Sequence, residues 1–160
     1  MEKEKLKFCG QIRPASAADL SVVAGMVAKL ATHHGDVATV TREELARDIL
    51  GPNPWVRVLL AELRGTCVGY AALCPLARVQ YGMRGMDLHH LYVVPEARRT
   101  GVAKALIEAS QTVAEQQGCR YLAVGTHPEN TLVHAIYPAL GFDRLDAPGP
   151  RFSITLKPAS

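Results

Sequence analysis

The stretch Leu88–Ala109, LHHLYVVPEARRTGVAKALIEA, carries the strongest structural signal in the sequence. It is expected to form a strand to Val94, a turn at Pro95, a segment rich in arginine and glycine, and then a helix. One face of that helix is apolar at helical spacing, at positions Val102, Ala105, Leu106, Ala109 and Val113. A helix N-terminus presents free N–H groups, and two adjacent arginines add positive charge there. The pattern therefore predicts a site for a phosphate or pyrophosphate group.

The phosphate site lacks the spacing of two common nucleotide-binding loops, because neither GxxxxGK nor GxGxxG occurs in the sequence. Instead, Arg98–Ala103, RRTGVA, fits the pattern Q/R-x-x-G-x-G/A. Directly after LYVVP and directly before an amphipathic helix, this segment resembles the phosphate-binding turn of the GNAT superfamily of N-acetyltransferases. The resemblance implies an enzyme that moves an acetyl group from acetyl-CoA to an amine. An alternative is a loop capped by solvated arginines.

The composition is that of an ordinary globular protein, and it argues against several function classes. A length of 160 residues predicts one domain, 1–160. The net charge of +3 comes without a basic stripe, so no nucleic-acid partner is expected. The four cysteines lack metal-ligand spacing, so no metal is expected, and because three of them lie in or beside apolar runs, buried free thiols are expected. The sequence has no apolar stretch of about 18 residues, so no membrane span is expected. The charged start MEKEKLKF favours a cytoplasmic protein.

The expected order of elements is β-α-α-β-β-β-α-β-α-β-β, which resembles the element order of the same superfamily. The elements before the phosphate site are a strand Gln11–Pro14, a helix from Ser16 or Ala17 to Leu30, a helix from Thr41 to Leu50 with a capping box, and strands Trp55–Leu63 and Cys67–Cys74. After it come a helix ended by Gly118, a strand Tyr121–Thr126, a helix Asn130–Leu140, and a closing hairpin of Phe142–Leu145 and Phe152–Leu156. The fold class is α/β (α+β), with a mixed, mostly antiparallel sheet of about seven strands flanked by about four helices. The segments Thr41–Pro54 and L-x-x-L-Y-V look like the diamine acetyltransferase branch.

The resemblance assigns the cofactor contacts. The pantetheine arm of acetyl-CoA is expected along the backbone of Leu91, Tyr92 and Val93. The pyrophosphate is expected in the turn and the start of the helix, at Arg98, Arg99, Thr100, Gly101, Val102, Ala103 and Lys104. Asn130 is expected to hydrogen-bond the cofactor arm. The superfamily more often has glycine where Arg99 stands, and a side chain there is expected to be tolerated if φ is negative.

Tyr137 is the expected general acid. The series Asn130, Val133, Ile136, Tyr137, Gly141 and Phe142 resembles the superfamily pattern N-x-x-A-x-x-F-Y-x-x-x-G-F. A phenol is neutral at pH 7 and has a pKa of about 10, comparable to a leaving thiolate, so it can protonate that thiolate. The alternative is a core tyrosine with its hydroxyl at the surface.

His89 and His90 depart from the diamine branch, which carries acidic residues there. Successive residues alternate faces on a regular strand, so at most one histidine is expected to point into the substrate cleft. With a pKa of about 6.5, that histidine is a candidate general base. The alternative is that both are packing or surface residues. His33 and His34 are weaker candidates for a substrate wall, and Glu62 and Asp87 are the remaining acids able to bind or deprotonate an amine.

The acceptor pocket is expected, by the resemblance, around Trp55, Tyr81, Arg78 and Arg84. An arginine-bearing pocket without an acidic pair favours an acceptor with its own carboxylate. The sequence thus predicts an acetyl-CoA-dependent N-acetyltransferase that acts by direct attack on a primary amine of a small molecule. The alternative is a non-catalytic acyl-CoA sensor or assembly module. A homodimer is expected by resemblance alone.

Overall fold

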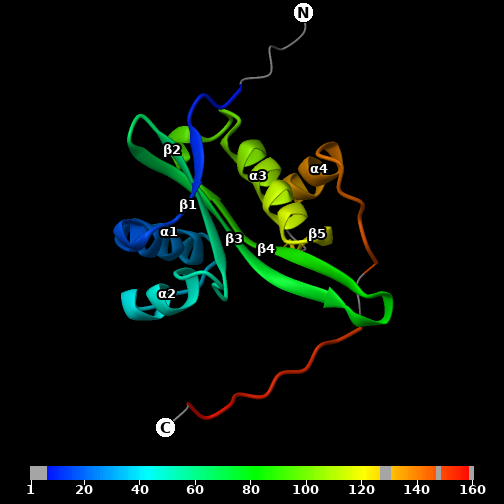
Figure 1. The fold of residues 1–160 in the computed structure, drawn as a ribbon. Helices are drawn as coiled ribbons and strands as arrows, with labels where there is room; N and C mark the ends of the chain where they lie inside the picture. The colour runs from blue at the N-terminus through cyan, green and yellow to red at the C-terminus, as the bar shows by residue number, and fades with distance from the viewer. Residues whose placement is uncertain (1–6, 127–130, 147–148, 159–160) are drawn as a thin grey trace, which may run out of the picture. The chain divides into compact units, whose positions relative to one another are not determined.

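The computed structural model describes residues 7–126, 131–146 and 149–158, and the chain divides into two compact units (Figure 1). The first unit spans Met1–Gly125 and the second spans Thr126–Ser160. The first contains a β-sheet with its helices, and the described residues of the second contain one helix followed by chain without regular secondary structure. The expectation of one domain over 1–160 stays a prediction.

The sheet of the first unit is mixed, in the strand order β1-β2-β3-β4-β5 (Figure 1). Neighbours are antiparallel from β1 to β4, whereas β5 is parallel to β4. The strands are β1 (Gln11–Pro14), β2 (Arg57–Leu63), β3 (Thr66–Arg78), β4 (Met83–Val93) and β5 (Cys119–Val124). The α/β class with a mostly antiparallel sheet is confirmed, with five strands in the described residues instead of about seven.

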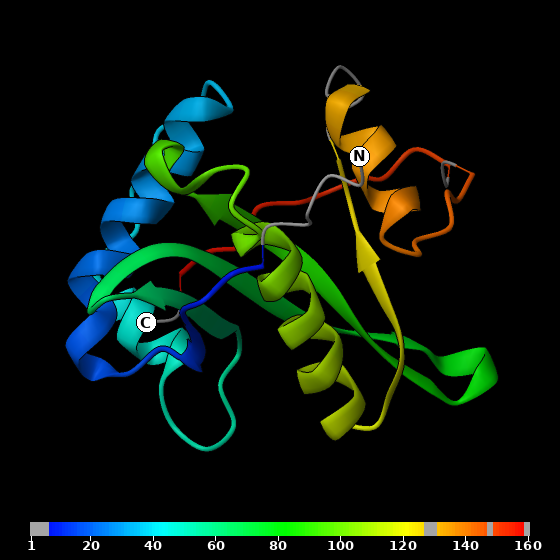
Figure 2. The ribbon, with the colours of Figure 1, turned by 90° about the horizontal axis from the view of Figure 1, so that it is seen from above.

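Helices cover both faces of this sheet (Figures 1 and 2). They are α1 (Leu20–His33), preceded by a 3-10 turn η1 (Ala17–Asp19), α2 (Arg42–Ile49) and α3 (Val102–Gln116). On one face α1 and α2 enclose a core with Leu60, Tyr70 and Tyr92. On the other face α3 packs against β2 to β5 and buries Leu106 and Ile107. Strand side chains alternate between faces, so one sheet supplies both cores.

The helix ends follow local signals. The predicted capping box forms at α2, where the Glu44 N–H donates to Thr41 Oγ1 (3.1 Å) and the Thr41 N–H donates to the Glu44 carboxylate (3.0 Å). Gly118 follows α3 with φ +76°, as expected for a C-terminal glycine. α1 continues past its predicted end at Leu30 to His33. No helix in the described part of the chain is long and apolar enough to cross a membrane.

Several strand boundaries were predicted too short. β3, predicted to end at Cys74, continues to Arg78, and β4, predicted from Leu88, begins at Met83; a 3-10 turn η2 (Val79–Tyr81) joins them. From the Leu73–Leu88 pair to the Arg78–Met83 pair at its tip, the β3–β4 hairpin is paired residue by residue. A strand continues wherever its neighbour offers ladder hydrogen bonds, and local sequence does not report that partner.

In the second unit, α4 (Thr131–Ala139) forms where a helix was predicted, and Gly141 follows it with φ +93°. The predicted closing hairpin of Phe142–Leu145 and Phe152–Leu156 is wrong: neither segment is a strand. The exposed fractions of Phe152, Ile154 and Leu156 are 94%, 82% and 80%. An alternating apolar pattern forms a strand only when its backbone finds a pairing partner, and the described residues supply none here.

Candidate active site

β4 loses one of its two neighbours halfway along its length. β3 pairs with β4 from Met83 to Val93, but β5 pairs only with Arg84–Leu88. In the described part of the chain, no strand pairs with the outer edge of residues 89–93. The polar backbone groups on this edge can therefore accept an extended ligand, apart from Val93 O, which accepts a hydrogen bond from Arg98 Nε (3.1 Å).

A β-bulge in β4 places the side-chain rings of the consecutive residues His89 and His90 against each other. Ala72 pairs with His90 and Leu73 pairs with Leu88, so His89 is an extra residue in β4. The rings of His89 and His90 stack, with centroids 4.4 Å apart and planes at 14°. The alternation of faces expected of a regular strand does not hold at these two residues, because the bulge interrupts it; that at most one histidine points into the substrate cleft stays a prediction.

The two histidines have different surroundings. The side chain of His89 is 57% exposed, and its Nδ1 lies 3.9 Å from a carboxylate oxygen of Asp87. His90 is half-buried, and its Nδ1 lies 3.0 Å from the hydroxyl of Tyr70, a residue with no exposed surface. Burial, with smaller contributions from His89 and His34, lowers the pKa of His90 to about 4. His90 is therefore neutral at physiological pH.

The start of α3 has the geometry expected of a phosphate site. Gly101 caps the helix with φ +85°, and the first helical hydrogen bond runs from the Ala105 N–H to Gly101 O (3.0 Å). The N–H groups at 102–104 therefore have no acceptor within the helix. Arg99 has φ +65°, so the condition under which a side chain was expected to be tolerated there, a negative φ, is not met. The arginine therefore occupies the left-handed conformation that glycine adopts most readily.

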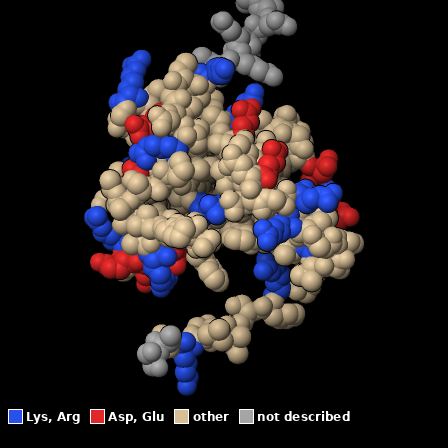
Figure 3. All heavy atoms as spheres, viewed as in Figure 1, with Lys and Arg blue, Asp and Glu red and all other residues tan. Residues whose placement is uncertain are grey.

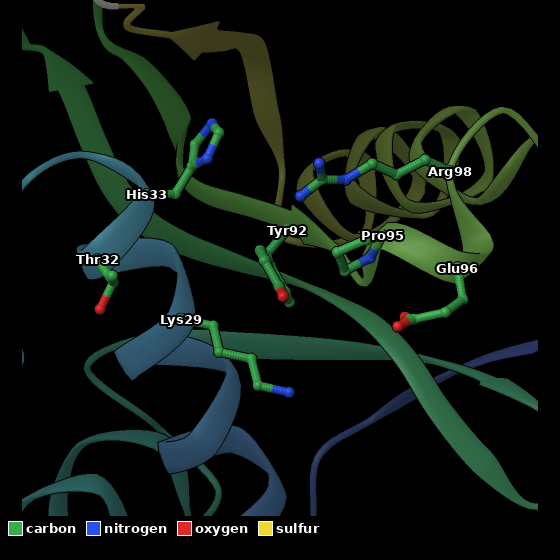
Figure 4. Close-up of a pocket in the computed structure, with 7 residues that line it drawn as sticks. All are labelled: Lys29, Thr32, His33, Tyr92, Pro95, Glu96 and Arg98. Atoms are coloured by element: carbon green, nitrogen blue, oxygen red, sulfur yellow. The ribbon is translucent and has the colours of Figure 1, made fainter.

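A pocket of about 430 Å³ lies between α1 and the end of β4 (Figure 4). Tyr92 stands between the α1 side chains and those that follow β4 (Figure 4). The lining residues are Lys29, Thr32, His33, Tyr92, Pro95, Glu96 and Arg98. Of these, His33, Tyr92 and Arg98 were predicted from the sequence. Lys29, Thr32 and Glu96 carry no motif and were missed, because only the packing of α1 beside β4 makes them neighbours.

The structure does not gather the expected acceptor residues in this pocket. Arg78 lies over the ring of Tyr121 in β5, with its guanidinium carbon 4.0 Å from the ring centroid. Tyr81 lies in η2 and is 69% exposed, and Trp55, in the loop before β2, is 79% exposed. Glu62 is not a free acid, because its carboxylate accepts from Arg13 Nε (2.7 Å).

Two further residues expected at the phosphate site make contacts within the protein. Lys104 lies on the exposed side of α3, 3.7 Å from Glu108, and the Thr100 hydroxyl donates to Ala97 O. Acidic and basic side chains are interspersed over the face shown in Figure 3. Among the described residues no His, Cys, Asp or Glu cluster is placed to hold a metal ion. The four cysteines are free, and Cys9 is exposed whereas the other three are half-buried.

In the second unit, Tyr137 lies on α4 and packs edge-to-face against Phe142, with ring centroids 5.3 Å apart at 71°. The Phe142 N–H donates to Tyr137 O (3.1 Å), which holds the turn after the helix. Burial raises the pKa of the Tyr137 phenol, so the hydroxyl is protonated at neutral pH. Asn130 lies outside the described residues.

Comparison with known proteins gives consistent matches. The model of the Acetyltransferase (GNAT) family matches residues 28–142. The aminoglycoside N(6')-acetyltransferase type 1 of Salmonella typhimurium is 42% identical over 59 residues, which cover 37% of this chain and only 41% of that enzyme. The thialysine N-epsilon-acetyltransferase of Bos taurus is 27% identical over 139 residues, 81% of this chain and 82% of that protein.

Solved structures show the same fold. A probable acetyltransferase has a TM-score of 0.76 at 21% identity and covers 93% of this chain and 99% of its own. An aminoglycoside N-acetyltransferase, AAC(6')-Iy in complex with CoA, has a TM-score of 0.70 at 26% identity, with coverage of 91% of this chain and 100% of its own.

Proposed function

Because this chain belongs to the Acetyltransferase (GNAT) family, we propose that it transfers an acetyl group from acetyl-CoA to a primary amine of a small molecule. The observation that carries the proposal is the unpaired edge of β4 at residues 89–93, which leads through the loop 94–101 to the start of α3. A ligand that carries an extended arm and a pyrophosphate needs an open strand edge for the arm, followed by an anion-binding helix start for the pyrophosphate. The similar structure in complex with CoA supports the same ligand.

The contacts with acetyl-CoA are assigned residue by residue. The pantetheine arm pairs with the backbone of Leu91, Tyr92 and Val93. The pyrophosphate binds the N–H groups at the start of α3, where the helix dipole and Gly101 favour an anion. Arg99 adds its charge there, whereas Arg98 holds the end of β4 through Val93 O.

The acceptor occupies the pocket between α1 and β4. Its lining carries two cations, Lys29 and Arg98, and one anion, Glu96. Charges of both signs suit an acceptor that has an amine and a carboxylate. Relatives named for aminoglycosides and thialysine support an amine acceptor.

The reaction is a direct attack. The amine nitrogen bonds to the thioester carbonyl carbon, the carbon–sulfur bond breaks, and the thiolate takes a proton. Tyr137 supplies that proton, because its pKa is raised and its hydroxyl therefore carries hydrogen at neutral pH. The cytoplasmic location and the homodimer stay predictions.

The test is release of free CoA thiol from acetyl-CoA in the presence of a panel of polyamines, aminoglycosides and amino acids. We expect acceptor-dependent thiol release, with mass spectrometry showing the acetylated amine. If CoA binds but no acceptor is acetylated, the proposed enzymatic activity is refuted and the alternative, a non-catalytic acyl-CoA sensor, is favoured. Lys29→Glu should raise KM for a carboxylate-bearing acceptor without changing KM for acetyl-CoA.

A further inference from the structure

Among the residues that the structure describes, the hydroxyl of Tyr70 has one hydrogen-bond partner, His90. Tyr70 lies on β3 opposite Tyr92, with no exposed surface, and His90 pairs with Ala72 two positions along. The phenol oxygen is 3.0 Å from His90 Nδ1, and the rings meet edge-on with centroids 6.0 Å apart at 77°. No other hydrogen bond of this hydroxyl exists among the described residues.

The direction of this hydrogen bond determines where His90 carries its hydrogen. A buried O–H group needs a hydrogen-bond acceptor. In the described residues, every buried side-chain nitrogen or oxygen atom has a hydrogen-bond partner. If Nδ1 donated to the phenol, the Tyr70 O–H would have no acceptor. The phenol therefore donates to a bare Nδ1, and neutral His90 carries its hydrogen on Nε2.

The surroundings keep the ring neutral as well as oriented. Burial opposes protonation of His90 most strongly, and the positively charged forms of His89, stacked on the ring, and of His34, at the end of α1, add to it. Tyr70 on β3 faces the ring as a neutral phenol because burial raises its pKa. His90 then offers a ligand a single ring nitrogen, Nε2, and that nitrogen bears hydrogen.

We propose that Tyr70 is a positioning residue that holds His90 as the Nε2–H tautomer, so that His90 acts as a hydrogen-bond donor and not as the general base. The proposal rests on the acetyl transfer proposed above. As the amine nitrogen bonds to the thioester carbon, negative charge grows on the carbonyl oxygen, and Nε2–H donates to that oxygen. When the carbon–sulfur bond breaks, the charge passes to the thiolate, which is protonated. The proton lost by the amine goes to solvent through exposed groups such as His89.

The first test is the tautomer itself. Long-range proton–nitrogen NMR of the protein with ¹⁵N-labelled histidine should show His90 with hydrogen on Nε2 and a bare Nδ1 between pH 6 and 8. The His90→Gln spectrum assigns the signal. A hydrogen on Nδ1, or a charged ring in this range, would overturn the proposal whatever the enzyme does.

The second test separates a donor from a base. A glutamine amide can donate from about the place of Nε2 but cannot accept a proton at neutral pH. His90→Gln should therefore keep kcat within about tenfold of the unsubstituted enzyme, whereas His90→Ala should lose about 10²–10³-fold, as for other lost oxyanion donors. Equal losses in the two variants would assign His90 as the base and overturn the donor role.

Tyr70→Phe tests the positioning role. It should lower kcat about five- to tenfold, the effect of one ordinary hydrogen bond, with KM for both substrates unchanged. The NMR signal of His90 should then show both tautomers. Tyr121→Phe, a matched change on β5, should leave kcat and the His90 signal unchanged. A Tyr70→Phe enzyme with native kcat and a native His90 tautomer would remove Tyr70 from the mechanism. An unsubstituted protein with no turnover would refute the proposed acetyl transfer. The NMR experiment would then still test whether Tyr70 sets the tautomer of His90.

Discussion

Gly101→Glu should abolish the stabilisation of this protein by CoA while leaving it folded. Gly101 is the N-cap of α3 with φ +85°, and three free N–H groups follow it. Glutamate has to adopt a backbone conformation that favours glycine, and its carboxylate enters the region where the pyrophosphate binds. The variant should therefore lose CoA through both the bulk and the charge of the new side chain.

The size of the effect follows from linkage. CoA at about 100 times its Kd adds roughly 2.7 kcal/mol to the free energy of unfolding. For a chain of this length, about 1 kcal/mol shifts Tm by roughly 2–4 °C, so the unsubstituted protein should gain about 5–11 °C. The left-handed backbone should cost the variant about 1–2 kcal/mol without ligand, which lowers its own Tm by roughly 2–8 °C.

The assay is thermal unfolding with and without CoA, with two controls. Gly118→Glu puts the same residue at φ +76° at the opposite end of α3, so it should unfold earlier but keep the full CoA shift. Gly101→Ala has the backbone strain without the charge and should keep part of the shift. If the unsubstituted protein shows no shift at saturating CoA, or Gly101→Glu retains all of it, the phosphate site at α3 is refuted.

Three further outcomes are expected. Tyr137→Phe should lower turnover about 10²–10⁴-fold with an unchanged CoA melting shift, and unchanged turnover with chemistry rate-limiting would contradict the acid role. Spermidine should be a poor acceptor, because His89 and His90 offer a polycation no negative charge; a kcat/KM for spermidine above that for amino acids would contradict this. Asp19 accepts hydrogen bonds from Arg13, which hold the pKa of its carboxyl well below the usual value of 3.8. This stabilisation is present above pH 4 and lost as pH falls, so Asp19→Asn should be less stable at pH 7 and show a shallower loss of stability in acid urea titrations.

Much of the local structure could be predicted from the sequence because its causes are local. The Thr41–Glu44 capping box and the glycine after α3 depend on residues within a few positions of each other. The apolar face predicted for α3 is only partly right, because Val102 and Leu106 are buried, but Ile107, Ser110 and Ala114 are the other buried residues in place of Ala105, Ala109 and Val113. The turn RRTGVA also predicted the family from local sequence, and the family is confirmed, whereas the phosphate site at this turn stays a proposal. These features depend on backbone geometry that one short segment sets by itself.

Other features of the site could be seen only in the tertiary structure, because they depend on contacts between residues that are distant in sequence. The bulge that brings His89 beside His90 exists only in the pairing of β4 with β3, and Tyr70 is 20 positions from the histidine it contacts. Arg78 lies over the ring of Tyr121, and the carboxylate of Glu62 is paired with Arg13. Local sequence showed neither of these contacts. The sequence determined which local elements and which chemistry-bearing residues are present. Strand register and helix packing decided which of those residues meet, because a shift of one residue in a strand moves every side chain to the other face.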